Sequence, residues 1–338
     1  MDNWIIQKEV FRYVEMSSDQ VVIVQSNLES LIVNGGPCSG KTITAIMKAR
    51  TLGIGNRRCL YITATTLSQK YVKQLFYDLR LSMHDCITYN EIENNPKRYD
   101  VVILDDSHRY SLDQIQALVS KAEYLLLFGD YTHSLHNTTS NTTIGELVHT
   151  LHCKVFNLYP CHIATKSYIR LIPNCFEPLG QSKTTNEIPY IVKFNSLEEQ
   201  CIAVKQIIES HRLDNVAILC YTRALVRSIN EIFGKFRWPI EAYLPGKDGI
   251  DTFDVTSKKP KVITIASSFG LHFESVFVIG FDSKLVWKNP EDALKTIVTR
   301  PTKNLFIFYE NQLPEPLASI SQEFYKICVG NNDIDFRF

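Results

Sequence analysis

The stretch LIVNGGPCSGKTITAIMKA, residues 31–49, is the most informative part of this chain. An apolar run at 31–33 precedes a glycine-rich loop that fits G-x-x-x-x-G-K-[ST], and a helical run at 43–49 follows the loop. In such a strand–loop–helix unit, backbone N–H groups and the positive end of the helix dipole hold phosphate oxygens. Because strand and helix both accompany the motif, we expect a nucleotide site rather than a chance match.

The loop predicts a role for its residues. Lys41 is expected to reach the β- and γ-phosphates, and the Thr42 hydroxyl is expected to hold Mg²⁺. A redox role for Cys38 is conceivable, but we favour a small tolerated side chain, since only accessible thiols of low pKa react readily. Contacts to ATP are expected along the whole loop, at Gly35, Gly36, Pro37, Cys38, Ser39, Gly40, Lys41 and Thr42.

Composition and charge limit the class of protein. The chain has 338 residues, 45% hydrophobic and 21% charged, which is typical of a globular protein of about two domains. Lys and Arg number 36, as do Asp and Glu, so no overall field draws the protein to nucleic acid or an acidic membrane, although a local basic groove stays compatible with this balance. The start resembles no signal peptide and the apolar runs are strand-sized, so we expect no membrane partner. Nine cysteines without a C-x-x-C pair indicate a reducing, cytoplasmic setting.

Short β-type runs alternate with helical runs along the whole chain. This pattern predicts an α/β fold of mainly parallel sheets with helices on both faces. The polar, turn-rich segment 133–146 is interpreted as the start of a domain crossing, which gives two domains, 1–150 and 151–338. Strand-like runs are expected at 30–35, 58–64, 99–106, 123–130, 153–159, 189–194, 215–222, 261–266, 274–282 and 304–310.

The segment YDVVILDDSHRY, residues 99–110, is a second nucleotide-binding element. An apolar strand that ends in acidic residues places a carboxylate beside the phosphate loop, where it can hold Mg²⁺. We assign that role to Asp105, and we assign Asp106 as the base that positions the attacking water. The alternative is a pair of strand-end aspartates that cap a helix.

Taken in their order along the chain, the sequence motifs resemble those of superfamily 1 helicases of the UvrD/Rep type, and the resemblance covers almost the whole chain. Gln20, fifteen residues before Gly35, is similar to the adenine-reading glutamine of that family. DDSH stands where the family has D-E-x-Q, and GDYTH, with His133, where it has G-D-x-x-Q. ALKTIVTRPTKNLFIFYE is similar to V-A-x-T-R-A-K-x-x-L, which puts Arg300 in the place of the arginine finger. The alternative for Arg300 is a cation at a helix C-terminus.

The resemblance implies a fold, cofactors and a partner. It implies two RecA-like lobes that bind ATP and Mg²⁺ between them, with Gln20, His133 and Arg300 among the ATP contacts. It also implies single-stranded nucleic acid as a partner. The residues implied in nucleic-acid contact are Thr63 and Thr65 in LYITATTLSQKYVKQL, Thr88 in CITYNEI, and His136, where the family stacks a tyrosine.

Several positions depart from the family. Asp106 replaces a glutamate and is one methylene shorter, and a misplacement of about 1 Å can cost on the order of 10²-fold in rate. His108 and His133 replace two glutamines that sense the γ-phosphate; they could still donate hydrogen bonds, but ordinary polar substitution is the interpretation we favour. The large insertions of the DNA helicases are missing, so we expect a compact motor core that does not separate strands unaided.

Three functions are compatible with these residues. The first is an ATP-dependent, helicase-like motor or switch that acts on single-stranded nucleic acid with a protein partner that supplies substrate engagement or effector activity. The second is a nucleotide-binding regulatory subunit with weak or no turnover, which controls a partner such as a nuclease in antiviral defence. The third, a small-molecule kinase, leaves the second lobe and Arg300 unexplained.

Overall fold

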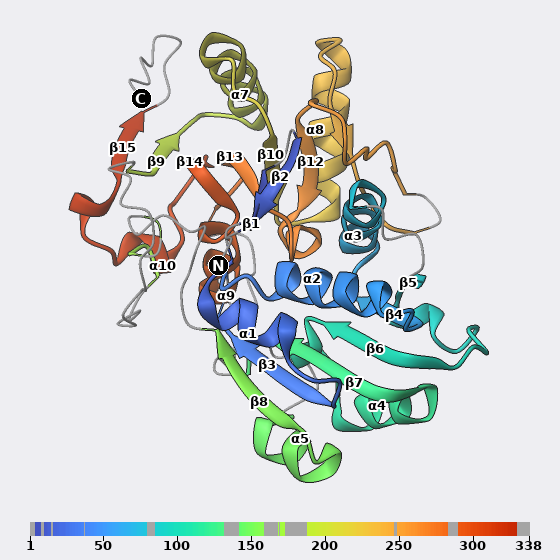
Figure 1. Ribbon diagram of the computed structural model, residues 1–338. Helices are drawn as coiled ribbons and strands as arrows, with labels where there is room; N and C mark the ends of the chain where they lie inside the picture. Colours follow the sequence, from blue (N-terminus) through green and yellow to red (C-terminus); the bar gives the residue numbers. More distant parts are fainter. Residues whose placement is uncertain are drawn as a thin grey trace. The chain divides into compact units, whose positions relative to one another are not determined.

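The structure is a computed structural model that describes residues 4–7, 10–14, 16–36, 38–79, 85–131, 142–158, 168, 170–172, 188–246, 249–282 and 290–329. The chain divides into two compact units, Met1–His162 and Ile163–Phe338, each built around its own sheet (Figure 1). Near the start of the chain, β1 (Trp4–Gln7) and β2 (Val10–Val14) form a separate antiparallel pair. Within the described ranges, no helix combines the length and apolar character needed to cross a bilayer.

The first unit contains a six-stranded sheet in the order β5-β4-β6-β7-β3-β8, and every described pairing in it is parallel. The strand β7 therefore lies between β3, which leads into the phosphate loop, and β6, which ends in Asp105. The strands are β3 (Leu31–Gly35), β4 (Cys59–Thr63), β5 (Asp85–Thr88), β6 (Tyr99–Asp105), β7 (Ala122–Gly129) and β8 (Lys154–Leu158).

Helices cover both faces of this sheet (Figure 1). Residues of α1, α2 and α3 share one apolar cluster with one face of the strands, and residues of α4 and α5 share a second cluster with the other face. Burial on both faces explains why these strands read as nearly continuous apolar runs in the sequence. The helices are α1 (Ser18–Gln25), α2 (Lys41–Ile54), α3 (Thr66–Asp78), α4 (Leu112–Ala117) and α5 (Ile144–Leu151), with 3₁₀ turns η1 (Tyr89–Glu91), η2 (Ser107–Arg109) and η3 (Leu118–Lys121).

The strand β8 belongs to the first unit, although the sequence analysis placed residues 153–159 after the domain crossing. It pairs with β3 along its whole length, from Leu31 opposite Lys154 to Gly35 opposite Leu158. The first compact unit accordingly extends to His162 rather than to residue 150. The polar segment at 133–146 misled the division because such a segment also occurs between a strand and the next helix of one domain.

The second unit contains a seven-stranded sheet in the order β11-β12-β10-β13-β14-β9-β15, and its described pairings are also parallel. One face of the sheet shares an apolar cluster with α7 and α8, while α9 packs against β14. The strands are β9 (Tyr190–Lys193), β10 (Val216–Cys220), β11 (Glu241–Ala242), β12 (Lys261–Thr264), β13 (Phe273–Val278), β14 (Pro301–Tyr309) and β15 (Lys326–Val329). The helices are α7 (Leu197–His211), α8 (Arg223–Lys235), α9 (Pro290–Val298) and α10 (Glu315–Ala318), with 3₁₀ turns η4 (Ile265–Ser268) and η5 (Gln322–Phe324). The predicted fold class, two α/β lobes around mainly parallel sheets, is confirmed.

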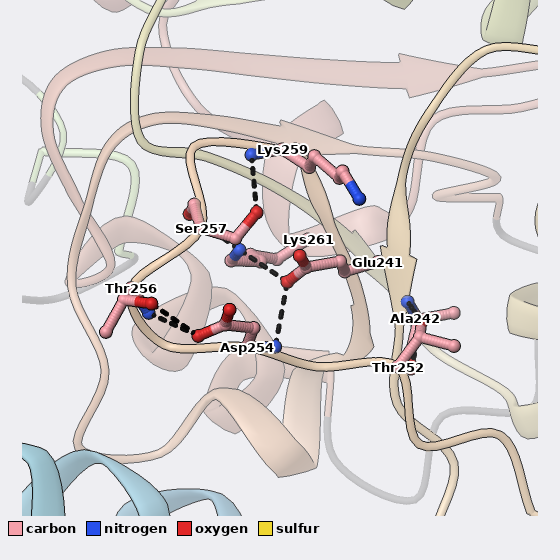
Figure 2. A network of polar contacts seen from close by, with 8 residues as sticks. All are labelled: Glu241, Ala242, Thr252, Asp254, Thr256, Ser257, Lys259 and Lys261. Carbon is pink, nitrogen blue, oxygen red and sulfur yellow. Dashed lines mark hydrogen bonds and ion pairs between the residues drawn. The ribbon is translucent and has the colours of Figure 1, made fainter.

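A buried ion pair holds a loop against the edge of the second sheet (Figure 2). Lys261 Nζ lies 2.6 Å from Glu241 Oε2, and both side chains are less than 10% exposed (7% and 5%). The same carboxylate oxygen accepts a hydrogen bond from the backbone N–H of Asp254 at 2.9 Å, and the ammonium donates to the carbonyl of Ser257 at 2.8 Å. The buried ion pair between β11 and β12 thus fixes the path of residues 254–257.

Substitution Lys261→Met should destabilise the protein by about 3–5 kcal/mol, because it leaves the Glu241 carboxylate buried without its cation. Urea denaturation measures this loss. Lys303→Met is the matched control: it removes the cation of an exposed pair with Glu274, so we expect a change of at most about 1 kcal/mol. Equal effects of the two substitutions would show that the buried pair does not hold the loop.

Candidate functional site

The sequence motifs of the first unit meet at one edge of its sheet. Parallel strands end at the same edge, so the C-terminal ends of β3, β7, β6, β4 and β5 stand side by side there. From β3 the chain enters α2, on the face that also carries α1 and α3, whereas α5, which leads to the neighbouring β8, packs on the opposite face. In open α/β sheets, ligands bind at the point where the connections from neighbouring strands run to opposite faces of the sheet.

The phosphate loop turns into α2 at Gly40, which has a φ of 85° and is the N-cap of the helix. The backbone angle favours glycine, and a Cβ at this position would lie 2.2 Å from Gln20 Nε2 and displace that amide. No side chain caps this N-terminus among the described residues, and no acidic residue lies in its first turn. The positive end of the dipole is therefore left for an anion.

Lys41 points back over the loop. Its Nζ donates hydrogen bonds to the carbonyl oxygens of Gly35 at 2.6 Å and Gly36 at 2.8 Å. The ammonium thus lies above the loop that the motif assigns to phosphates, and a phosphate oxygen could replace these carbonyls as its partner.

Ser39 provides a further indication that the loop fits a phosphate group. Its hydroxyl is buried and has no hydrogen-bond partner within the described part of the chain. A buried polar group without a partner costs about 1–3 kcal/mol, which an acceptor from a ligand could recover. Cys38, beside it, is buried with a φ of 61°, and this burial does not favour a redox role.

Asp105, at the end of β6, is buried and receives hydrogen bonds on both carboxylate oxygens. Tyr61 donates its hydroxyl to Oδ2 at 3.0 Å, and the backbone N–H of Asp106 donates to Oδ1 at 3.1 Å. Burial and the Asp106 carboxylate raise the pKa of Asp105 to about 7, against hydrogen bonds from the Thr42 and Tyr61 hydroxyls and the charge of Lys41. The two residues assigned to Mg²⁺, Thr42 and Asp105, are therefore hydrogen-bonded to each other, and a divalent cation would favour the charged carboxylate.

Asp106 and His108 follow Asp105 in a tight turn. Asp106 has a φ of 52°, a left-handed conformation that a short Asp tolerates better than most residues. His108 Nδ1 accepts a hydrogen bond from the backbone N–H of Asp130 at 3.1 Å. A neutral His108 ring therefore carries its proton on Nε2, so this atom is a donor.

Asn34 is a site residue that the sequence analysis missed. Its Oδ1 accepts from the backbone N–H of Tyr131 at 2.9 Å, and its Nδ2 donates to Asn157 Oδ1 at 3.1 Å. These bonds connect the ends of β3, β7 and β8 beneath the loop. The available signal was a lone polar residue between an apolar strand and the glycines, LIVN-GG.

Gln20 lies against the phosphate loop. It is buried, its Nε2 donates to the carbonyl of Ser39 at 3.4 Å, and its Oε1 accepts from the backbone N–H of Ser17 at 2.9 Å. Lys48 fixes the other end of α1, since its Nζ donates to the carbonyls of Val24 and Ser26 at 3.2 Å and 2.6 Å. Adenine contact by Gln20 stays a prediction.

The threonines assigned to nucleic acid lie at neighbouring strand ends, where Thr63 is opposite Thr88. Thr63 is buried, and its hydroxyl is within hydrogen-bond distance of the carbonyls of Thr65 and Ile87, at 3.3 Å and 3.4 Å. Thr65 caps α3 and Thr88 donates to Glu91, and both are partly exposed. Pro37, His133 and His136 lie outside the described residues.

Arg300 lies between α9 and β14 in the second unit and is buried. Its guanidinium donates to the carbonyls of Ser268 and Leu271 at 3.0 Å and 3.1 Å, and its Nε donates to the carbonyl of Thr296 at 3.1 Å. These bonds tie η4 and the residues after it to the end of α9. The arginine-finger role stays a prediction.

Comparisons with known proteins show a distant likeness to solved structures. No family model and no curated protein matches the chain. Among solved structures, the C-terminal domain of a possible DNA helicase from Lactobacillus plantarum WCFS1 is similar with a TM-score of 0.38 and 16% sequence identity, over 49% of this chain and 98% of that domain. At this level of similarity no function carries over from that domain.

The pKa of Asp105 predicts a dependence of stability on pH. The native carboxyl keeps its proton up to about pH 7, whereas the unfolded chain releases it near the ordinary pKa of 3.8, so the native state binds more protons in between. Native stability therefore falls as the pH rises through this interval. In EDTA, from about pH 5 to about pH 8, wild-type protein should lose melting temperature relative to Asp105→Asn. Parallel pH profiles of the two proteins would contradict this.

Proposed function

We propose that this chain binds ATP·Mg²⁺ and hydrolyses ATP as a helicase-like motor or switch coupled to single-stranded nucleic acid, in a complex with a protein partner. One observation supports it above the others: the phosphate loop, Thr42 and Asp105 converge at the same edge of the first sheet. The uncapped helix N-terminus, the Lys41 ammonium and the unpartnered Ser39 hydroxyl all suit the phosphates of a nucleotide.

Different residues of the first unit have different roles in the proposed phosphoryl transfer. Thr42 and Asp105 would hold Mg²⁺, which would neutralise phosphate charge when bound. Lys41 exchanges the carbonyls of Gly35 and Gly36 for phosphate oxygens. The backbone amides of the loop orient the chain of phosphates, so the site acts mainly by positioning and charge stabilisation.

Asp106 is the residue that orients the attacking water and accepts its proton. Its left-handed backbone directs the chain away from β6 directly after the Mg²⁺ ligand, and its carboxylate is only partly buried. In this proposal Arg300 comes from the second lobe to stabilise the charge on the transferred group, and it must then exchange backbone carbonyls for phosphate oxygens.

Substitution Lys41→Ala should weaken ATP·Mg²⁺ binding by about 10- to 100-fold or abolish it, because it removes a charge-assisted hydrogen bond to phosphate. Titration with a fluorescent ATP analogue measures the affinity. Lys97→Ala, which removes an exposed lysine of the same unit, should bind like the wild type. Unchanged affinity in Lys41→Ala would overturn the nucleotide assignment.

Coupling to nucleic acid has a physical route within the first unit. Strand β4, whose tip carries Thr63 and Thr65, pairs directly with β6, which carries Asp105. A ligand that shifts the tip of β4 would therefore also shift the neighbouring strand β6, which carries Asp105.

We expect single-stranded oligonucleotides to stimulate the ATPase, and we expect the stimulation to fade as salt is raised, because backbone phosphate contacts weaken steeply with ionic strength. Steady-state turnover with and without oligonucleotide, first at low salt, measures this. DNA and RNA of the same sequence serve as parallel substrates, and Lys41→Ala controls for contaminating ATPases. An ATPase rate that no nucleic acid changes would favour the regulatory subunit described below.

The alternative is a regulatory subunit that binds ATP as a conformational ligand, turns it over slowly or not at all, and controls a partner such as a nuclease in antiviral defence. The carbonyl partners of the Arg300 guanidinium favour it, because a finger held by its own lobe loses those bonds on reaching a nucleotide. The buried Thr63 hydroxyl also favours it, since this group is already turned into the protein.

A further inference from the structure

Tyr61 places a hydroxyl group in the core of the first unit. Tyr61 is fully buried in β4, within the apolar cluster beneath α2 and α3. Phenylalanine would fill such a position without the need to satisfy a hydroxyl. The partner that the hydroxyl finds is the buried carboxylate of Asp105, at 3.0 Å.

The strand register explains why Tyr61 reaches this carboxylate. Tyr61 lies opposite Ile103 of β6, and Asp105 is two residues further along the same strand. Side chains two residues apart point to the same face of a sheet, so Asp105 projects on the side where Tyr61 lies. The Phe76 ring of α3 packs edge-on against the Tyr61 ring, with centroids 5.5 Å apart, and so restricts the direction of the hydroxyl.

The two hydrogen bonds of Asp105 define the plane of its carboxyl group. Tyr61 occupies Oδ2 and the Asp106 N–H occupies Oδ1, so neither oxygen can rotate without the loss of a buried bond. The Thr42 hydroxyl also bonds to this carboxyl group, on the side where the phosphate loop begins α2. Partners of this kind orient metal-binding carboxylates, and their loss typically costs 10- to 100-fold in metal affinity.

We propose that Tyr61 is a positioning residue for the Mg²⁺ ligand Asp105: its hydroxyl fixes the carboxylate in the orientation that binds the ion with Thr42. This inference rests on the proposed function, because it takes Asp105 as a ligand of nucleotide-bound Mg²⁺. Tyr61 itself touches neither the nucleotide nor the ion.

The test is Tyr61→Phe, which removes one oxygen and keeps the ring. The Mg²⁺ concentration for half-maximal binding of a fluorescent ATP analogue should rise by about 10-fold or more. Affinity for the same analogue in EDTA should stay at the wild-type value, since the phosphate loop is unchanged. If Tyr61 had a purely structural role, Tyr61→Phe would change the melting temperature and leave the Mg²⁺ concentration for half-maximal binding at the wild-type value.

Tyr71→Phe is the matched control, because Tyr71 of α3 packs against the same cluster and its substitution also removes one hydroxyl. It should keep the wild-type Mg²⁺ dependence. Should Tyr61→Phe fail to fold, Tyr61→Met also removes the hydroxyl with a side chain that adapts to irregular space, and carries the same expectation.

The outcomes separate this inference from the function on which it rests. If wild-type binding depends on Mg²⁺, Asp105→Asn loses that dependence, and Tyr61→Phe matches the wild type within about twofold, the positioning role is overturned while the function stands. If the wild type shows no Mg²⁺-dependent nucleotide binding, both are overturned.

Discussion

Parallel pairing is the constraint on which the first unit depends. Each strand needs a crossover before the next one, so all six strands end at a single edge, and the residues that follow them are brought together there. Residues far apart in the sequence, such as Thr42, Asp105 and Asp130, thereby come to lie at one edge of the sheet. Chemistry at that edge requires no special fold beyond the sheet, only suitable residues at the strand ends.

The buried ionisable groups in the described part of the protein are stabilised mainly by uncharged groups. Asp105 receives hydroxyl and amide hydrogens, and Lys48 and Arg300 donate to backbone carbonyls. Glu241 and Lys261 form a buried ion pair that a backbone amide and a carbonyl complete. Full hydrogen bonding is what makes such charges tolerable in an interior of low dielectric.

The sequence was sufficient for features that depend on local pattern. The helical run at 43–49 lies within α2, and the strand before the glycine-rich loop matches β3, because apolar spacing and turn residues act over a few neighbouring positions. The strands that escaped this reasoning include β1, β5 and β15, with four residues each, and β11, with two. Strands this short have too few residues to show a recognisable apolar periodicity in the sequence.

Within the candidate site, the sequence could give the motif residues but not their partners. Tyr61, Asn34 and the carbonyls around Arg300 act through pairing between distant segments, which no local pattern encodes. The same reason explains Thr63, which the family resemblance assigned to nucleic acid and whose burial comes from its position beside β5. Register decides these contacts, and register is a property of the folded sheet.

The Glu241–Lys261 pair also bears on how the second unit responds to its solution. Counter-ions screen charges at the surface within about 10 Å at 0.1 M salt but reach a buried pair far less. The dehydration cost of such a pair also falls on heating. The segment held by this pair is thus little affected by ionic strength, so this edge of the second sheet should keep its structure as the salt concentration rises.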